Sequence, residues 1–366
     1  MEEEMVYRIA LTRIPLVGAK IGKQLVAYCG GPREVFEESK SRLLRIPGVG
    51  ETIANAIRNA DPYALAEPDL DYIQGHNIQT CFYLDDHYPK RLLNVEDGPL
   101  LLYYKGDFDP NPGRTVAIVG TRKPTSYGIS CCEHLVKDLE AYEVQIISGL
   151  AYGVDAVAHR SANQHEVENL AIMGTGINTI YPGTHRQLAQ AIQDNGAVMT
   201  EYPLHTKADR ENFPRRNRII AAMADVTVVI QSAAKGGSLI TAEYANAYHK
   251  DVFAYPGRAT DEQSEGCNKL IKQNKAHLIE SAADIGYIMR WEIGEDKPSP
   301  KQRELFVDLT VEEQRIVDLI KAKDEVSVDL LHIETRQTLS QLSAVLLGLE
   351  LKGVIRSKPG SSYTLA

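Results

Sequence analysis

The stretch Thr115–Gly128, TVAIVGTRKPTSYG, decides the fold, because an apolar run suited to a β-strand ends abruptly in a turn that leads into a helix. Val116 and Ile118 fit a strand that is buried on both faces. We expect Gly120 to let the backbone turn sharply into a loop whose N–H groups can face an anion. Arg122 adds a permanent cation over the same crevice. The stretch therefore predicts the first strand and turn of a parallel α/β sheet.

The alternation of strand and helix continues downstream and indicates the fold class. Strands are expected at 116–120, 144–149, 169–173, 197–201, 226–231 and 251–255. Helices are expected between them, at 127–141, 154–164, 185–194, 215–224 and 238–249. This order predicts a Rossmann-like, doubly wound parallel sheet. Ligands bind such sheets beyond the C-terminal ends of the strands, so the turns at those ends are the candidate site.

These turns are rich in glycine. Six glycines suit a close approach of the backbone to phosphates: Gly149, Gly153, Gly174, Gly176, Gly236 and Gly237. Ser238 would place its hydroxyl beside a helix N-terminus, where both would face an anion. The first turn is not G-x-G-x-x-G and no acidic residue closes the second strand, which disfavours a dinucleotide-dependent dehydrogenase. We expect neither a metal nor a cofactor.

The composition is that of an ordinary soluble globular protein. The chain has 366 residues, of which 43% are hydrophobic and 24% charged. Its N-terminus, MEEEMVYRIALTRI, is acidic and unlike a signal peptide, and no run of about 18 apolar residues is present. We therefore expect a cytoplasmic protein without a membrane span. The five cysteines form no CxxC pair, which argues against a zinc site and against a disulfide framework.

The net charge restricts how the chain could bind nucleic acid. At −9, the overall field repels phosphates, so any nucleic-acid site must be a local basic patch. One such patch lies at 210–218, RENFPRRNR, where four arginines accompany one glutamate and Phe213. Phe213 is either a stacking platform or a core residue of the next helix. Pro214 at the helix start is expected to leave Phe213 outside the helix, which favours the platform.

A helical domain is expected before the sheet, at residues 1–65. It carries turn signals at 14–20 and 46–52, and the second, IPGVGET, has the form of a helix-hairpin-helix, whose free N–H groups can meet a phosphate. A small helical cap packed on the main domain fits these residues equally well. The Rossmann-like core is placed at 66–290, with 66–114 as its N-terminal extension.

A further small domain is expected after the sheet. Residues 291–304 have no apolar period and predict a linker. Thr310 and Glu313 form a predicted capping box, and three helices followed by a hairpin over 305–366 predict a winged helix. The third helix, at 338–352, carries one Lys, one Glu and no Arg. Packing or protein docking is therefore favoured over reading of the DNA major groove.

Five motifs, in order and within residues 116–271, resemble the DNA-processing protein A family (DprA, also called Smf): VAIVGTRKPTSYG, SGLAYGVDAVAH, ENFPRRNRII, GGSLITAEYA and YPGRATDEQSEGCNKLI. The resemblance implies a non-enzymatic protein of bacterial natural transformation that binds and protects incoming single-stranded DNA and loads the RecA recombinase onto it. It also implies a homodimer. KGGSL departs from the Ser-Gly-Ser of many relatives, and Arg210 replaces a lysine found in some.

The resemblance also implies a set of DNA-binding residues. The expected phosphate contacts are Arg122, Arg210, Arg215, Arg218 and Lys235. Phe213 would stack on a base, and Asn217 would support the loops around the crevice. The residues expected to line the same crevice are Gly236, Gly237, Ser238, Asn268 and Lys269. Asp155 and His159 lie four apart on one helix face, but no nucleophile or metal set accompanies them, so a structural role is favoured.

Two other functions remain open. The core also resembles the lysine-decarboxylase-like phosphoribohydrolases, which cleave nucleoside monophosphates: GGSLITAE is similar to their PGGxGTxxE, with Glu243 in the comparable place. The proline and the second glycine of that motif are missing. A regulator that binds double-stranded DNA through the winged helix is the third hypothesis, and it requires duplex binding that survives deletion of residues 115–290.

Overall fold

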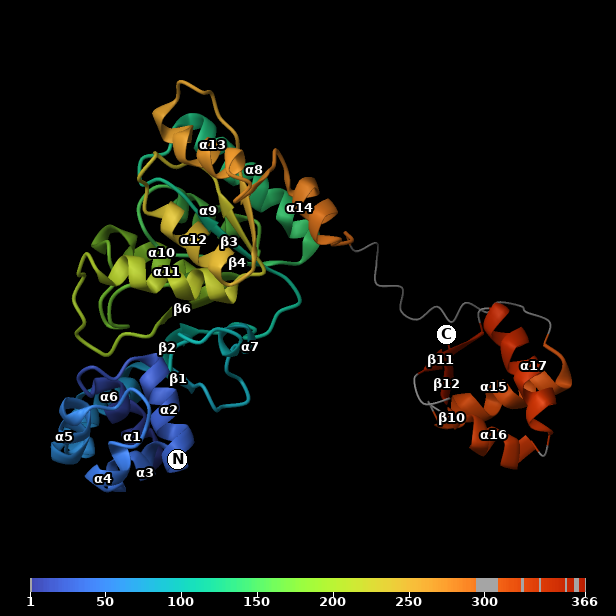
Figure 1. Cartoon of the computed structure of the whole chain (residues 1–366). Helices are drawn as coiled ribbons and strands as arrows, with labels where there is room; N and C mark the ends of the chain where they lie inside the picture. The colour runs from blue at the N-terminus through green and yellow to red at the C-terminus, as the bar shows by residue number, and fades with distance from the viewer. Residues whose placement is uncertain are drawn as a thin grey trace. The chain divides into compact units, whose positions relative to one another are not determined.

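The structure, a computed structural model, describes residues 2–293, 309–323, 326–335, 337–352, 354–358 and 362–365. The chain divides into two compact units, Met1–Gly294 and Glu295–Ala366 (Figure 1). The linker predicted at 291–304 lies mostly outside the described residues. Each unit has a hydrophobic core of its own.

The first unit is built on a nine-stranded sheet with the order β1-β2-β6-β5-β4-β3-β7-β8-β9. The strands are β1 (Gln79–Phe82), β2 (Leu101–Gly106), β3 (Thr115–Val119), β4 (Gln145–Ser148), β5 (Asn169–Ile172), β6 (Gly196–Thr200), β7 (Val226–Val229), β8 (Asp251–Ala254) and β9 (His277–Leu278). β2 runs antiparallel to both of its neighbours, β1 and β6. The seven strands β6, β5, β4, β3, β7, β8 and β9, in their order across the sheet, are parallel to one another. All six strands predicted from the sequence are confirmed. The doubly wound class is confirmed with them.

Helices cover both faces of the sheet. One face carries α8 (Ser126–Leu139), α9 (Val154–Gln164) and α14 (Ala282–Met289). The other carries α7 (Lys90–Leu93), α11 (Asn212–Met223), α12 (Ser238–Ala247) and α13 (Glu265–Lys272). α10 (Arg186–Asp194) packs near β6 and shares a core with the N-terminal helices. In the described part of the chain, no helix is both long and apolar enough to span a bilayer.

The N-terminal helices gather beside β1 and β2, with which they share a core (Figure 1). They are α1 (Glu2–Arg13), α2 (Ala19–Cys29), α3 (Pro32–Glu37), α4 (Lys40–Leu43), α5 (Glu51–Asn59) and α6 (Pro62–His76). Both predicted turn signals start a helix, because Gly18 caps α2 and Gly50 caps α5. Gly48 takes a left-handed φ of 81°, and Leu16 takes one of 65° at the same place in the first signal. The first turn therefore departs from the motif by holding a leucine in a conformation that favours glycine.

The second unit is a winged helix, as predicted. Its helices are α15 (Val311–Lys323), α16 (Val328–Thr335) and α17 (Leu339–Leu351), and its sheet joins β10 (Val326–Ser327), β12 (Ser362–Leu365) and β11 (Ile355–Lys358). The predicted capping box is present: Thr310 N donates to Glu313 Oε2 at 2.8 Å, and Glu313 N donates to Thr310 Oγ1 at 3.3 Å. A second box, of Thr338 and Gln341, starts α17.

Candidate nucleic-acid interface

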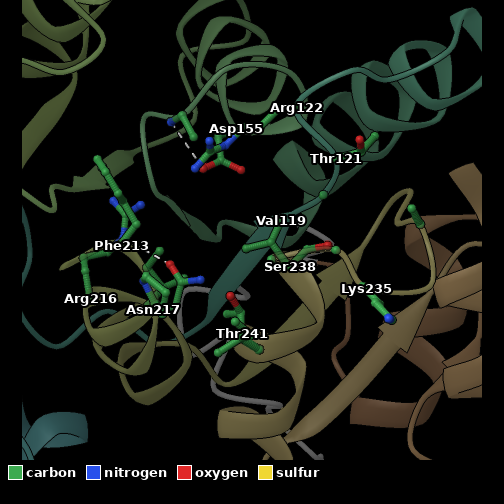
Figure 2. Close-up of a pocket in the computed structure, with 18 of the residues that line it drawn as sticks. Val119, Thr121, Arg122, Asp155, Phe213, Arg216, Asn217, Lys235, Ser238 and Thr241 are labelled. Carbon is green, nitrogen blue, oxygen red and sulfur yellow. Dashed lines mark hydrogen bonds between the residues drawn. The ribbon is translucent and has the colours of Figure 1, made fainter. Parts of the chain in front are cut away.

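The candidate site is a pocket of about 750 Å³ at the point where the strand order of the sheet reverses. β3 and β7 are neighbours there, but α8, which follows β3, and α12, which follows β7, cover opposite faces. The loops between them leave a crevice, as expected for a doubly wound sheet. Figure 2 shows Phe213, Arg216 and Asn217 on one side of it and Lys235 on the opposite side, with Val119 between.

The two loops that form the crevice are tied together by Gln231, which lies two residues after the end of β7. Thr121 N donates to Gln231 O at 2.7 Å, and Thr125 N donates to its side-chain oxygen at 2.9 Å. A Cβ on Gly128 would lie 2.1 Å from that oxygen, so only glycine lets α8 approach so closely. This contact positions the Arg122 loop against β7.

Gly120 has a different role from the one predicted. Its φ is not left-handed, and a Cβ there would lie 2.5 Å from Val154 Cγ2, so Gly120 is needed for close packing against α9 rather than for a sharp turn. The N–H groups of Thr121 and Lys123 are also used within the protein, by Gln231 O and by Thr121 Oγ1. The loop therefore offers an anion its cationic side chains more than its backbone.

The pocket is strongly cationic, although the chain as a whole is acidic. Among the described residues that line it, five carry a positive charge and one a negative charge: Arg122, Lys123, Arg210, Arg216, Lys235 and Asp155. Arg122, Arg210 and Lys235 are exposed, and within the described chain none of them forms an ion pair. These three predicted phosphate ligands are thus brought together at one site with their charges uncompensated.

Arg216 forms the buried side of the pocket and was not predicted. It is 3% exposed, donates to Gly149 O at 2.7 Å and also to Ile172 O, and so links α11 to the ends of β4 and β5. Burial lowers its pKa to about 10, and the neighbouring Asp155 opposes that shift. Burial likewise raises the pKa of Asp155. Arg216 shares the helix spacing of the buried Ile219 and Ile220, which is the sequence signal that could have identified it.

Phe213 lies in the pocket wall, partly buried. Its ring centroid is 5.4 Å from that of Tyr181, and the Arg122 guanidinium lies 5.9 Å from it, within cation–π range. The expectation that Pro214 leaves Phe213 outside the helix is wrong, because α11 begins at Asn212. A proline is tolerated in the first turn of a helix, where its N–H would have no partner.

Arg215 and Arg218 do not line this pocket, contrary to expectation. Both border a second cavity, of about 410 Å³, near α2. Arg215 is exposed and pairs with Glu211 at 3.4 Å. Arg218 is largely buried, pairs with Glu201 and donates to Asp97 O at 2.6 Å. Its charge is therefore compensated inside the protein, which argues against the predicted phosphate contact.

The loop residues Gly236, Gly237 and Ser238 line the pocket together with Asn217, as predicted. The hydrogen bonds of Ser238 and Asn217 differ from the expectation. The Ser238 hydroxyl donates to Ser232 Oγ at 3.0 Å instead of facing outward. Asn217 accepts a hydrogen bond from Arg216 Nε at 3.2 Å and so supports this arginine instead of the loops around the crevice. Gly237, at the N-terminus of α12, borders open space, because a Cβ added there would meet no atom within 4 Å.

Asn268 and Lys269 lie outside the residues that line the pocket, which corrects their predicted placement. Asn268 bonds both backbone groups of Gly257, at 3.2 Å to N and 3.0 Å to O, and so holds the loop after β8. His159 is structural, as favoured. It is fully buried, with Nδ1 2.6 Å from Asn169 Oδ1, and it accepts from Leu150 N at 3.3 Å.

These features define a class of protein: a Rossmann-like sheet with a cationic, aromatic-walled pocket at its switch point, joined to a winged helix. Residues 79–289 match the family model described as DNA recombination-mediator protein A, and residues 297–361 match that of the DprA winged helix domain. The chain therefore belongs to the DNA recombination-mediator protein A family, which confirms the resemblance. Its role lies in DNA processing and recombination.

Known relatives cover most of the chain. Protein Smf of Synechocystis is 31% identical over 98% of both chains, and the DNA processing protein DprA of Streptococcus pneumoniae is 39% identical over 55% of this chain and 71% of its own. The crystal structure of the S. pneumoniae protein matches 79% of this chain and 98% of its own, with a TM-score of 0.66 and 29% identity. DNA processing protein A of Helicobacter pylori, whose structure is described for its single-stranded DNA binding mode, matches 59% and 97%, with a TM-score of 0.53 and 29% identity.

Proposed function

We propose that the chain binds single-stranded DNA in the switch-point pocket and protects incoming strands during natural transformation and recombination. The observation that carries the proposal is the set of three exposed cations, none of them in an ion pair with another described residue, around a partly exposed phenylalanine, in a chain of net charge −9. Cations that follow a backbone, together with a ring that stacks on bases, are typical of single-strand binding. The binding mode ascribed to the H. pylori relative supports the same ligand.

The test is a comparison of single- and double-stranded oligonucleotides of equal length and sequence. Fluorescence anisotropy across a range of salt concentrations gives both affinity and its salt slope. Single strands should bind much more tightly, because an aromatic platform needs unstacked bases, and their affinity should fall with salt because phosphate contacts release counterions. Equal affinity for both forms would refute the proposal.

The chain acts as a homodimer that delivers the strand to RecA. Both parts rest on the family, whose description as a recombination mediator fits a handover of DNA. For the handover, single strands covered by a single-strand-binding protein are offered to RecA, and DNA-dependent ATP hydrolysis by RecA is followed; the chain should shorten the lag. For the dimer, sedimentation equilibrium should give twice the chain mass. An unchanged lag would exclude RecA loading, and a monomer would exclude the dimer.

The nucleotide-processing alternative requires a carboxylate in the pocket. Glu243 is exposed on α12 and is not among the lining residues, and Asp155, which is, lies buried beside Arg216. Incubation of the protein with nucleoside monophosphates, followed by chromatography for free base, tests this alternative directly. Release of base that depends on Asp155 or Glu243 would favour the enzyme over the binding protein.

A further inference from the structure

Two exposed tyrosines that the site prediction did not include belong to loops that border the pocket: Tyr181 lines it, and Tyr152 is the neighbour of the lining residue Ala151. Tyr181 follows β5 and is 46% exposed, and Tyr152 follows β4 and is 47% exposed. An exposed aromatic ring next to a ligand site is available to contact the ligand, because its apolar area is not buried within the protein. Both belong to loops at the C-terminal ends of parallel strands, the edge of the sheet at which the pocket opens.

Tyr181 continues the wall that Phe213 begins. It lines the pocket, and its ring centroid lies 5.4 Å from that of Phe213, with the two planes tilted by 39°. Gly174, in the loop before Tyr181, allows this approach, because a Cβ there would lie 2.9 Å from Phe213 Cδ1. The two rings thus form one aromatic surface that keeps about half of Tyr181 open to solvent.

Tyr152 is connected to the segments that carry this surface by contacts on two sides. Its neighbour Gly153 packs on the Arg122 loop, where a Cβ would lie 2.3 Å from Thr121 O, and takes a left-handed φ of 80° that favours glycine. Its hydroxyl lies 3.2 Å from Thr184 Oγ1, and its ring centroid 5.1 Å from that of His185. Segment 181–185 therefore contacts Tyr152 at one end and carries Tyr181 at the other.

The charges around these rings fit a polyanion. Arg122 lies beside Phe213, and Arg186, which directly follows His185, is exposed and forms no ion pair within the described residues. A protein partner would need apolar complementarity, whereas spaced rings with flanking cations match bases and phosphates of one strand. Duplex bases are stacked and cannot reach exposed ring faces.

We propose that Phe213, Tyr181 and Tyr152 form a row of stacking platforms that carries single-stranded DNA out of the pocket and across the loops after β5 and β4. This inference rests on the proposed function and specifies the path of the strand. Bases nearest the pocket stack on Phe213 and Tyr181, and a longer strand also reaches Tyr152. Tyr152 therefore acts only on strands long enough to leave the pocket.

The test measures affinity by fluorescence anisotropy for a series of oligothymidylates of increasing length. Tyr181→Ala should weaken binding at every length by roughly 5- to 150-fold, the range that corresponds to the loss of one stacked base. Tyr152→Ala should leave the shortest strands unaffected and weaken the longer ones. Neither variant should change the salt slope, because no phosphate contact is removed.

Matched variants separate stacking from other effects. Tyr181→Phe and Tyr152→Phe keep the ring and should bind like the parent, and Tyr287→Ala removes a tyrosine that is 86% exposed on α14, away from the pocket, and should have no effect. Tyr181→Leu, which keeps an apolar contact with Phe213 without a ring face, replaces the alanine variant if the latter unfolds. If the parent binds single strands and the Tyr181 and Tyr152 variants bind equally well at all lengths, the row is refuted while the proposed function stands. If the parent binds no single strand, the proposed function fails first.

Discussion

Arg122 is the residue with which the phosphate contacts are most directly tested. It is exposed, lies in the loop after β3 and has no carboxylate partner among the described residues. Arg122→Ala should weaken single-strand binding equally for all sequences and flatten the plot of log K against log salt by about 0.7 to 1. Anisotropy titrations at several salt concentrations measure this slope. Glu211→Ala, which removes a charge of the opposite sign outside the pocket, is the control, and an unchanged slope for Arg122→Ala would make this arginine a solvated surface charge.

The variant Phe213→Ala distinguishes between two roles of Phe213, as a stacking platform for a base and as a residue of the hydrophobic core. Phe213→Ala should weaken single-strand binding by about 1 to 3 kcal/mol with the salt slope intact. Because the ring is only partly buried, thermal unfolding should show a smaller loss of stability than the roughly 3 to 5 kcal/mol expected for a fully buried phenylalanine. Phe253→Ala, at a buried position in β8, provides that reference. A loss of stability equal to that of Phe253→Ala would assign Phe213 to the core.

Arg218→Ala should lower the stability of the fold without changing the salt dependence of DNA binding. Its side chain and that of its partner Glu201 are 15% and 17% exposed, so Arg218→Ala leaves a largely buried carboxylate without its cation. Roughly 3 kcal/mol of stability should be lost, the low end for breaking a buried pair, while the salt slope of DNA binding stays as in the parent. Chemical denaturation and anisotropy on the same sample measure both. A normal stability with a flattened slope would restore the predicted phosphate contact.

At the scale of elements, the loop after β4 depends on a histidine that burial keeps neutral. Burial lowers the pKa of His159 to about 4 from 6.5. Between these values the unfolded chain binds more protons than the folded one, so this group makes stability fall as the pH is lowered through that window. The loss from pH 7 to pH 5 should be roughly 2 kcal/mol.

His159→Gln isolates this contribution. The variant cannot take up the proton, so its free energy of unfolding, measured by denaturant titration at each pH, should fall less steeply than that of the parent. Asn169 and Leu150 are the hydrogen-bond partners that glutamine must satisfy. Parallel pH profiles for parent and variant would show that His159 titrates normally in the folded chain.

The strands and helices were predictable because their signals are local. Each buried strand is an apolar run that ends at a turn, as at Val116–Val119, and a capping box such as Thr310 with Glu313 lies within four consecutive residues. Contacts between distant segments have no such signal. Arg218 looks like its neighbours in RENFPRRNR, and only the fold brings Glu201 and Asp97 to it. Tyr181, in the pocket wall, was missed for the same reason, whereas Arg216 shares the helix spacing of the buried Ile219 and Ile220, a local signal that could have identified it.

At the scale of the whole molecule, the pocket belongs entirely to the first unit. All of its lining residues lie between Val119 and Gln263, and the winged helix has a separate core around Ile316, Leu331 and Leu346. A chain that ends at residue 293 should therefore keep the single-strand affinity and salt slope of the full chain. Anisotropy with the same oligonucleotides compares the two, and circular dichroism confirms that the shorter chain is folded.

The same pair of chains also tests whether the winged helix binds duplex. A winged helix that reads DNA places side chains of its third helix in the major groove and cations near phosphates, but 338–352 contains one Lys, one Glu and no Arg. On the exposed side, α17 instead presents Leu339 and Leu347. The full chain should accordingly bind duplex no better than the chain that ends at 293. Tight duplex binding by the full chain, lost on truncation, would identify the winged helix as a double-strand reader.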